Sequence, residues 1–103
     1  MVREEALRTP ALWAGVVFTE PGRFSGWHHH GTHESVIYVV RGAVQLECGP
    51  GGKTTLHAGP GDCIYVPRGE IHREGNDGFE ESEIVVIRSG DGELVVNVAG
   101  PAD

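Results

Sequence analysis

Short runs of apolar residues alternate with turn residues along the whole chain. The runs are rich in β-branched and aromatic residues, and they cover 12–18, 35–40, 43–47, 53–57, 63–66, 82–87 and 94–98. Pieces rich in glycine and proline separate them and recur about every 8–12 residues, a spacing typical of an all-β sandwich or barrel. No segment keeps a helical period, and only the first ten residues could form a short helix. The pattern therefore predicts an all-β fold.

Two pairs of neighbouring runs are expected to form hairpins. One would join 43–48 to 53–57 across the Gly-Pro-Gly-Gly turn at 49–52. The other would join 82–88 to 94–98 across the Ser-Gly-Asp-Gly turn at 89–92.

The length predicts one domain that spans residues 1–103. With 103 residues and 39% hydrophobic content, the chain is long enough for one core and too short for two. A domain of this size buries only about 60–65% of the surface that its unfolded chain exposes. A bound metal or a second subunit would add stability, so we expect a homodimer.

The charge and the start of the chain limit the partners and the location. A formal net charge of −7 would repel phosphate backbones and anionic lipid surfaces, so nucleic acid and membranes are not expected partners. The first ten residues carry charges of both signs and no apolar stretch typical of a secretory leader. The longest apolar run nearby, 36–40, is far below the length that spans a bilayer. These features favour a cytoplasmic protein.

The histidines suggest a metal site. Side chains two residues apart on a strand lie on one face, about 6.5–7 Å apart, so His28 and His30 can converge on one ion while His29 points away. Glu34 has the same parity, and His72 is needed to complete the set. Imidazoles with a carboxylate favour first-row divalent metals over calcium. His57 is expected on a solvent-facing strand.

Two spaced motifs contain these residues. The first runs through 22–42 and comprises Gly22, His28, His30, Glu34 and Gly42. The second runs through 61–76 and comprises Gly61, Pro67, Gly69, His72 and Asn76.

The two motifs together resemble those of small single-domain cupins. The resemblance implies a double-stranded β-helix, or jelly roll, with one metal inside the barrel near one mouth. It also implies His28, His30, Glu34 and His72 as the metal ligands.

The spacing of the first motif departs from the family pattern by one residue. Seven residues instead of six separate Glu34 from Gly42, so counting back from the glycine leads to Ser35. In one solution, a β-bulge between Glu34 and Tyr38 keeps Glu34 pointing inward. In a second, His33 turns in as the fourth ligand, and in a third, water takes that place.

The expected cofactor is one divalent transition metal: zinc, iron, manganese, nickel or copper. Open positions on such an ion could polarise a small-molecule ligand, as in an oxygenase or an isomerase. The alternative is a cupin that binds or senses a small ligand without transforming it and keeps a structural metal. The fold alone does not choose between an enzyme and a binding module.

Overall fold

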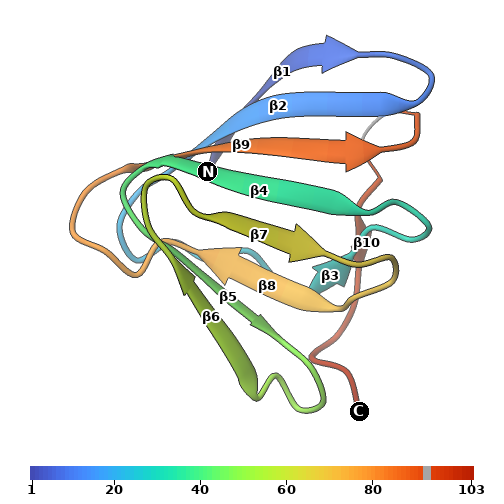
Figure 1. Ribbon diagram of the computed structural model, residues 1–103. Helices are drawn as coiled ribbons and strands as arrows, with labels where there is room; N and C mark the ends of the chain where they lie inside the picture. The colour runs from blue at the N-terminus through green and yellow to red at the C-terminus, as the bar shows by residue number, and fades with distance from the viewer. Residues whose placement is uncertain (92–93) are drawn as a thin grey trace.

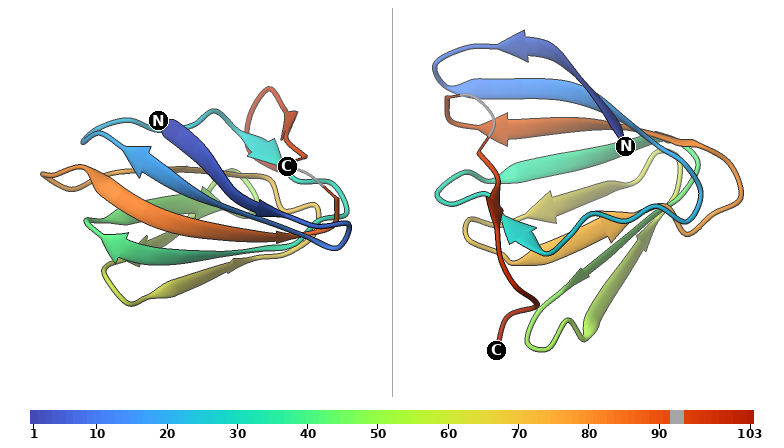
Figure 2. Two further views of the ribbon diagram at one scale, coloured as in Figure 1. Left: turned by 90° about the horizontal axis from the view of Figure 1, so that it is seen from above. Right: turned by 180° about the vertical axis from the view of Figure 1, so that it is seen from behind.

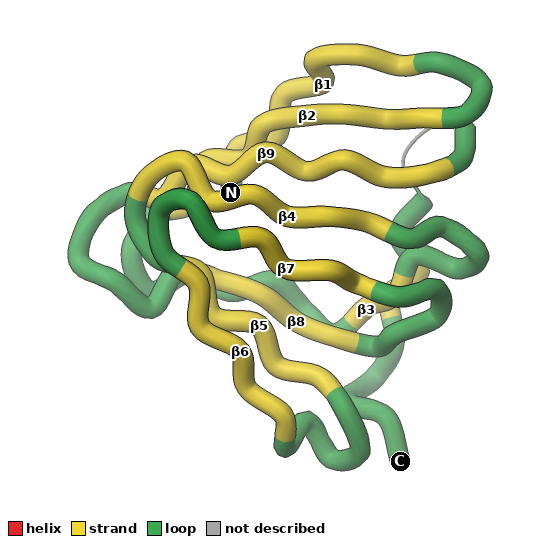
Figure 3. Tube along the Cα trace, in the orientation of Figure 1, coloured by secondary structure: helices red, strands yellow, loops and turns green. Residues whose placement is uncertain are grey.

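The computed structural model of the chain describes residues 1–91 and 94–103. Every regular element in this part of the chain is a strand, which confirms the all-β fold (Figure 3). The short helix considered for the first ten residues is wrong, because Val2–Arg8 form strand β1. The strands are β1 (Val2–Arg8), β2 (Leu12–Thr19), β3 (His28–His29), β4 (Ser35–Arg41), β5 (Val44–Cys48), β6 (Thr54–Ala58), β7 (Cys63–Val66), β8 (His72–Gly75), β9 (Ser82–Ser89) and β10 (Val96–Asn97).

The strands form two five-stranded antiparallel sheets that face each other (Figures 1 and 2). The first sheet has the order β1-β2-β9-β4-β7, and the second has the order β10-β3-β8-β5-β6. Sequence neighbours such as β4 and β5 thus belong to different sheets. Because the chain crosses repeatedly between the two sheets, segments that are distant in sequence line the same barrel interior.

The structure confirms one predicted hairpin and contradicts the other. Strand β5 pairs with β6, with Val44 opposite Ala58. Strand β9 pairs instead with β2 and β4, and β10 pairs with β3. The predicted hairpin between 82–88 and 94–98 is therefore wrong, and part of its expected turn, 92–93, lies outside the described residues.

The core lies between the sheets and follows the period of two along each strand. Strand β4 alternates buried and exposed residues, with Ile37 and Val39 buried. Strand β9 does the same with Ile84 and Val86. The other core residues are Trp13, Val17, Val44, Leu46, Cys48, Ala58, Ile64 and Val66.

The motif glycine Gly42 directly follows β4, at a position where no side chain fits. Its φ of 82° lies in the left-handed region, and a Cβ there would come within 2.8 Å of the Cα of Ser82. The pairing of β4 with β9 shifts register between Val39 and Arg41, just before this glycine. The extra residue of the first motif is thus absorbed next to Gly42.

The motif asparagine Asn76 stabilises the loop after β8. Its buried side-chain amide donates hydrogen bonds to the carbonyl oxygens of Thr19 (2.9 Å) and Glu80 (2.7 Å). Its Oδ1 accepts a hydrogen bond of 2.8 Å from the backbone N–H of Gly78. The side chain therefore joins three backbone positions from two parts of the chain.

Replacing Asn76 by alanine is expected to lower the free energy of unfolding by about 2–4 kcal/mol, because it leaves buried backbone groups without partners. Urea denaturation followed by circular dichroism measures this change. Asn97→Ala, at an exposed position on β10, is the matched control and should change the stability little. A loss below about 1 kcal/mol in Asn76→Ala would contradict the role given to this amide.

Candidate metal centre

Three histidines from two neighbouring strands meet inside the barrel. His28 lies on β3 directly opposite His72 on β8, and His30 follows β3 by one residue. Their exposed fractions are 5%, 0% and 3%, respectively. One ring nitrogen of each lies within 4.8 Å of the corresponding nitrogens of the other two. The structure thus brings together the three histidines named from the sequence.

Backbone carbonyls fix the protonation of all three rings. The Nδ1 atoms lie 2.9 Å from the carbonyl oxygen of Gly26 for His28, 2.7 Å from that of Leu94 for His30, and 2.8 Å from that of Glu70 for His72. A carbonyl oxygen can only accept, so each Nδ1 carries the proton and donates it. Each neutral ring then has its lone pair on Nε2, which is the arrangement that metal-binding histidines require.

Burial keeps the imidazoles of His28 and His30 neutral. It is the main cause that lowers the pKa of His28, and it lowers the pKa of His30 to about 3, assisted there by the charge of Arg88. The hydrogen bonds to Gly26 and Leu94 oppose these shifts but do not reverse them. Neutral imidazole is the form that binds metals.

The site fits a divalent transition metal. The Nε2 atom of His72 is buried and has no hydrogen-bond partner among the described residues. A buried acceptor without a partner is costly, so this lone pair favours a cation at the point where the three rings meet. Imidazole nitrogen is a good ligand for zinc, copper, iron and nickel. The described residues therefore include a group that could hold a metal ion.

Glu34 is not part of this group. Its carboxylate Oε2 accepts a hydrogen bond of 3.0 Å from the Tyr65 hydroxyl and lies 3.8 Å from Nε of Arg68. The pairing of β4 continues without a register shift from Ser35 to Val39, so Glu34 lies on the side opposite the buried residues of this strand. Its side chain is 43% exposed.

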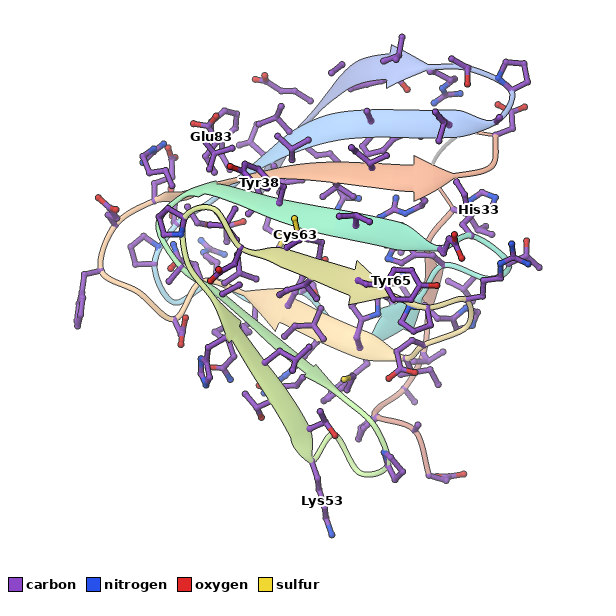
Figure 4. All side chains as sticks on the ribbon, viewed as in Figure 1. His33, Tyr38, Lys53, Cys63, Tyr65 and Glu83 are labelled. Atoms are coloured by element: carbon purple, nitrogen blue, oxygen red, sulfur yellow. The ribbon has the colours of Figure 1, made fainter. Side chains whose placement is uncertain are left out.

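His33 lies in the turn between β3 and β4, and it also stands apart from the three histidines. Its backbone N–H donates to the carbonyl oxygen of His30, and its ring packs against Gly90, where a Cβ would collide with it. Figure 4 shows His33 beside the end of β9. Its Nδ1 is buried without a hydrogen-bond partner among the described residues.

Ser35 lies where the count from Gly42 places the carboxylate of the family pattern. Ser35 is buried at the inward position of β4, and Arg88 is directly opposite on β9. The Nη2 atom of Arg88 lies 3.5 Å from Nε2 of His30, and its guanidinium lies 5.6 Å from the ring centroid of Trp13. Burial is the main cause that lowers the pKa of Arg88 to about 10, so it remains charged at neutral pH.

The sequence analysis missed Arg88, although the pattern of its strand carries a signal for it. Ser82, Ile84, Val86 and Arg88 share one parity on a strand whose other face is partly exposed. A charged residue on the inward face of a strand is unusual and typical of a functional site.

Glu74 adds a carboxylate to the interior. It follows His72 by two residues on β8, and the two side chains therefore lie on one face, about 6.5–7 Å apart. Its Oε2 is buried and without a hydrogen-bond partner in the described part of the chain. With Arg3 and Val17 it lines a cavity of about 10 Å³, which holds about one water molecule.

Together these side chains can hold an ion, attract an anion and move a proton. The three imidazoles would leave coordination positions for a ligand, since transition metals take four to six donors. Arg88 places a positive charge beside those positions, and Glu74 places a carboxylate in the same interior.

A family model described as a cupin domain matches residues 15–88. No curated protein gives a significant match to the chain. No helix in the described residues is long and apolar enough to span a membrane.

Several solved structures resemble the chain. A protein with a double-stranded β-helix domain from Klebsiella pneumoniae has a TM-score of 0.83 and 21% identity, over 94% of this chain and 78% of that one. KdgF from a Halomonas species has a TM-score of 0.77 and 27% identity, with coverages of 87% and 78%. A candidate sugar phosphate isomerase from Acidithiobacillus ferrooxidans has a TM-score of 0.66 and 27% identity, with coverages of 77% and 50%. These similarities confirm the predicted double-stranded β-helix.

Proposed function

The chain belongs to the cupin family, and from this membership and the three-histidine group we propose that it is a metal-dependent isomerase of a small molecule. The observation that carries the proposal is the convergence of three Nε2 lone pairs, each fixed by a backbone carbonyl at Nδ1. The sequence led us to expect oxygenation or isomerisation. We favour isomerisation, because it requires a group that transfers a proton and Glu74 can be that group.

The three histidines and Glu74 each have a part in this reaction. His28, His30 and His72 would hold the ion, which when bound would polarise a carbonyl or hydroxyl oxygen of the substrate. Glu74 would take a proton from the carbon next to the carbonyl and return it to the carbonyl carbon, while the proton of the substrate's hydroxyl group passes to the former carbonyl oxygen. The Oε2 atom of Glu74 is suited to this task, because it is buried and has no hydrogen-bond partner among the described residues, which leaves it able to accept a proton.

The relative from Acidithiobacillus ferrooxidans, a candidate sugar phosphate isomerase, supports the same class of reaction. This chain spans only half of that protein, so the likeness extends to the barrel and leaves the substrate open.

The experiment is a proton-exchange assay in D₂O. The protein loaded with zinc, manganese, iron or nickel is incubated with a panel of small aldoses, ketoses and keto acids, and NMR detects deuterium at the carbon next to the carbonyl. Glu74→Gln is expected to lower the exchange rate by about 100-fold or more and to leave the metal content unchanged. The carboxamide keeps the size of the side chain but cannot accept the proton.

Glu20→Gln is the matched control, since this carboxylate is 73% exposed, and its exchange rate should equal that of the wild type. Full exchange in Glu74→Gln would contradict the role of this carboxylate. Failure of every substrate to exchange, with metal bound, would contradict the isomerase.

A non-catalytic binding cupin is the second candidate, and one observation favours it. The three histidines are almost completely buried, and the cavity beside Glu74 has room for only about one water molecule. A metal enclosed in this way stabilises a fold without reacting. Tight binding of panel compounds without exchange would select this function.

We also propose that the partner of the chain is a second copy of itself. Exposed apolar side chains follow the outer faces of β4 and β7, where Tyr38 and Tyr65 lie on the same side (Figure 4). Arg41 and Glu34, of opposite charge, flank this row at its two ends. A two-fold axis near Tyr38 would place each Arg41 close to the other copy's Glu34.

Light scattering after size-exclusion chromatography is expected to give twice the chain mass of 11.0 kDa. Tyr38→Glu should shift the mass to that of one chain, because it places a carboxylate in the apolar row. Leu7→Glu is the control, since Leu7 is exposed on β1, which β2 and β9 separate from β4. A single-chain mass for the wild type, or an unchanged dimer in Tyr38→Glu, would contradict this interface.

A further inference from the structure

We infer that the segment 94–102 is a gate, which must detach from β3 before a metal ion can enter or leave the three-histidine site. This inference rests on the proposed metal site. It concerns the rate at which that site fills, which the proposed reaction leaves open.

The site is closed in the structure. The exposed fractions of His28, His30 and His72 are 5%, 3% and 0%, respectively. A hydrated ion cannot reach their nitrogens while the surrounding segments stay in place. Part of the barrel wall therefore has to open locally before the site can fill.

The segment 94–102 lies directly along the histidines. Its strand β10 pairs with β3, with Asn97 opposite His28. The carbonyl oxygen of Leu94 lies 2.7 Å from Nδ1 of His30. Figure 2 shows β10 beside β3 in the view from behind, where it forms the edge of the second sheet. Detachment of this segment would leave β3 as the edge strand and uncover one side of the site.

The side chain of Leu94 also covers the turn that follows His30. A Cβ at Gly31 would come within 2.7 Å of the Leu94 Cδ2 atom, so this side chain lies directly on the glycine. The carbonyl oxygen of Gly31 accepts a hydrogen bond of 2.8 Å from the N–H of Gly69, in the loop between β7 and β8. The segment and this loop thus meet at Gly31 and close the site together.

The loop at 67–71 is not suited to open. It is five residues long and joins β7, which pairs with β4, to β8, which pairs with both β3 and β5. Both of its ends are therefore held by the sheets, and a loop of this length has little freedom between them.

The segment 94–102 is held less firmly. Apart from the pairing of β10, its contacts include backbone hydrogen bonds from the Val98 N–H to the Trp27 carbonyl and from the Gly51 N–H to the Ala102 carbonyl. Its apolar side chains at 94–96 are 37–40% exposed, so docking buries only part of their surface. Segments with exposed hydrogen bonds and little buried apolar surface are the ones that open at low free energy.

The test fixes the far end of the segment to the barrel with a disulfide. Ala102 pairs with Pro50 in an isolated bridge, so Pro50→Cys and Ala102→Cys together place two thiols within reach of each other. The exposed Cys63 is replaced by serine in every protein compared. Cys48 stays, because burial raises the pKa of its thiol and makes it unreactive.

The measured quantity is the rate at which the metal-free protein takes up cobalt(II), followed by visible absorbance after rapid mixing. In the reduced protein, this rate is expected to rise with the cobalt concentration and then to level off at the rate of detachment. Oxidation of the cysteine pair should slow uptake by about 10-fold or more, and reduction should restore the rate, because only the free segment can open.

A disulfide elsewhere in the same sheet is the matched control. Gln45→Cys and His57→Cys lie opposite each other on β5 and β6, at the other edge of the second sheet. Oxidation of this pair should leave the rate of uptake unchanged.

Leu94→Ala acts in the opposite direction and tests the gate even if the first disulfide does not form. It removes the contact with Gly31 and keeps the carbonyl oxygen that faces His30, so uptake should become about 3- to 10-fold faster. Leu12→Ala is its control, since Leu12 on β2 is exposed to a similar extent (45%), and its rate should equal that of the wild type.

The outcomes separate the gate from the metal site. Equal rates in the oxidised and reduced forms of the cysteine pair at 50 and 102 would overturn the gate and leave the metal site intact. If that disulfide does not form, an unchanged rate in Leu94→Ala would overturn it in the same way. Failure of the wild type to bind cobalt after long incubation would overturn the proposed metal site and this inference together.

Discussion

Replacing His72 by alanine is expected to lower the metal affinity by about 100- to 1,000-fold, so that the purified variant contains no stoichiometric metal. His72 is fully buried and supplies one of three converging nitrogens. Mass spectrometry of the metals in protein purified from its own host, followed by titration calorimetry with the metal found, measures both quantities.

The control for this experiment is His57→Ala. His57 lies on β6 with its side chain 65% exposed and pairs with Asp77, so its loss should leave the metal content unchanged. Stoichiometric metal in His72→Ala would show that the three-histidine site is assigned wrongly.

The same assay decides the fourth ligand. The positions of Glu34 and His33 lead us to expect that Glu34→Gln and His33→Ala both keep their metal, with water or substrate in the remaining positions. An empty site in His33→Ala alone would instead favour four imidazoles.

Acidification is expected to destabilise the metal-free protein from about pH 6.5 downward. The folded chain keeps His30 neutral, with a pKa of about 3, whereas in the unfolded chain its pKa is 6.5. Between these values the unfolded state binds more protons, so the free energy of unfolding falls as the pH falls. The loss for His30 alone is about 2 kcal/mol between pH 6.5 and pH 5, and His28 acts in the same direction.

Urea denaturation of the chelator-treated protein between pH 7 and pH 5 measures this loss. His30→Gln, which has no group that titrates in this range, should show a flatter dependence over the same interval. Parallel curves for the two proteins would mean that burial does not hold His30 neutral.

The sequence was sufficient for the fold class and the three histidines, because both depend on local periods. The two-residue period places His28 and His30 on one face, and the second motif brings His72 to them. The hairpin expected after β9 failed for the opposite reason. The glycines at 89–92 indicate a turn, but they cannot show that β9 pairs with β2 and β4, whose residues are far away in sequence.

Glu34 shows why the site could not be completed from the sequence. On a strand, a shift of one residue exchanges the two faces, so the extra residue in the first motif decides whether Glu34 or Ser35 points inward. The register of β4 is fixed by its neighbours β7 and β9, and the irregularity lies beyond Val39. Only the pairing of β4 with β7 and β9 determines which of the two side chains points inward. The pairing of β4 with β9 also places Arg88 opposite Ser35.

The hydrogen bond from His30 to Leu94 ties the segment after β9 to the three-histidine group. The two residues lie 64 positions apart, and the segment that contains Leu94 is attached to β3 through β10 and through the bond from the Val98 N–H to the Trp27 carbonyl. Detachment of this segment would free the Nδ1 proton of His30 to move to Nε2, and the nitrogen that would bind a metal would become a hydrogen-bond donor. A segment that supplies no ligand thus holds the tautomer of His30, so that metal binding, if it occurs, would be thermodynamically linked to the order of this segment.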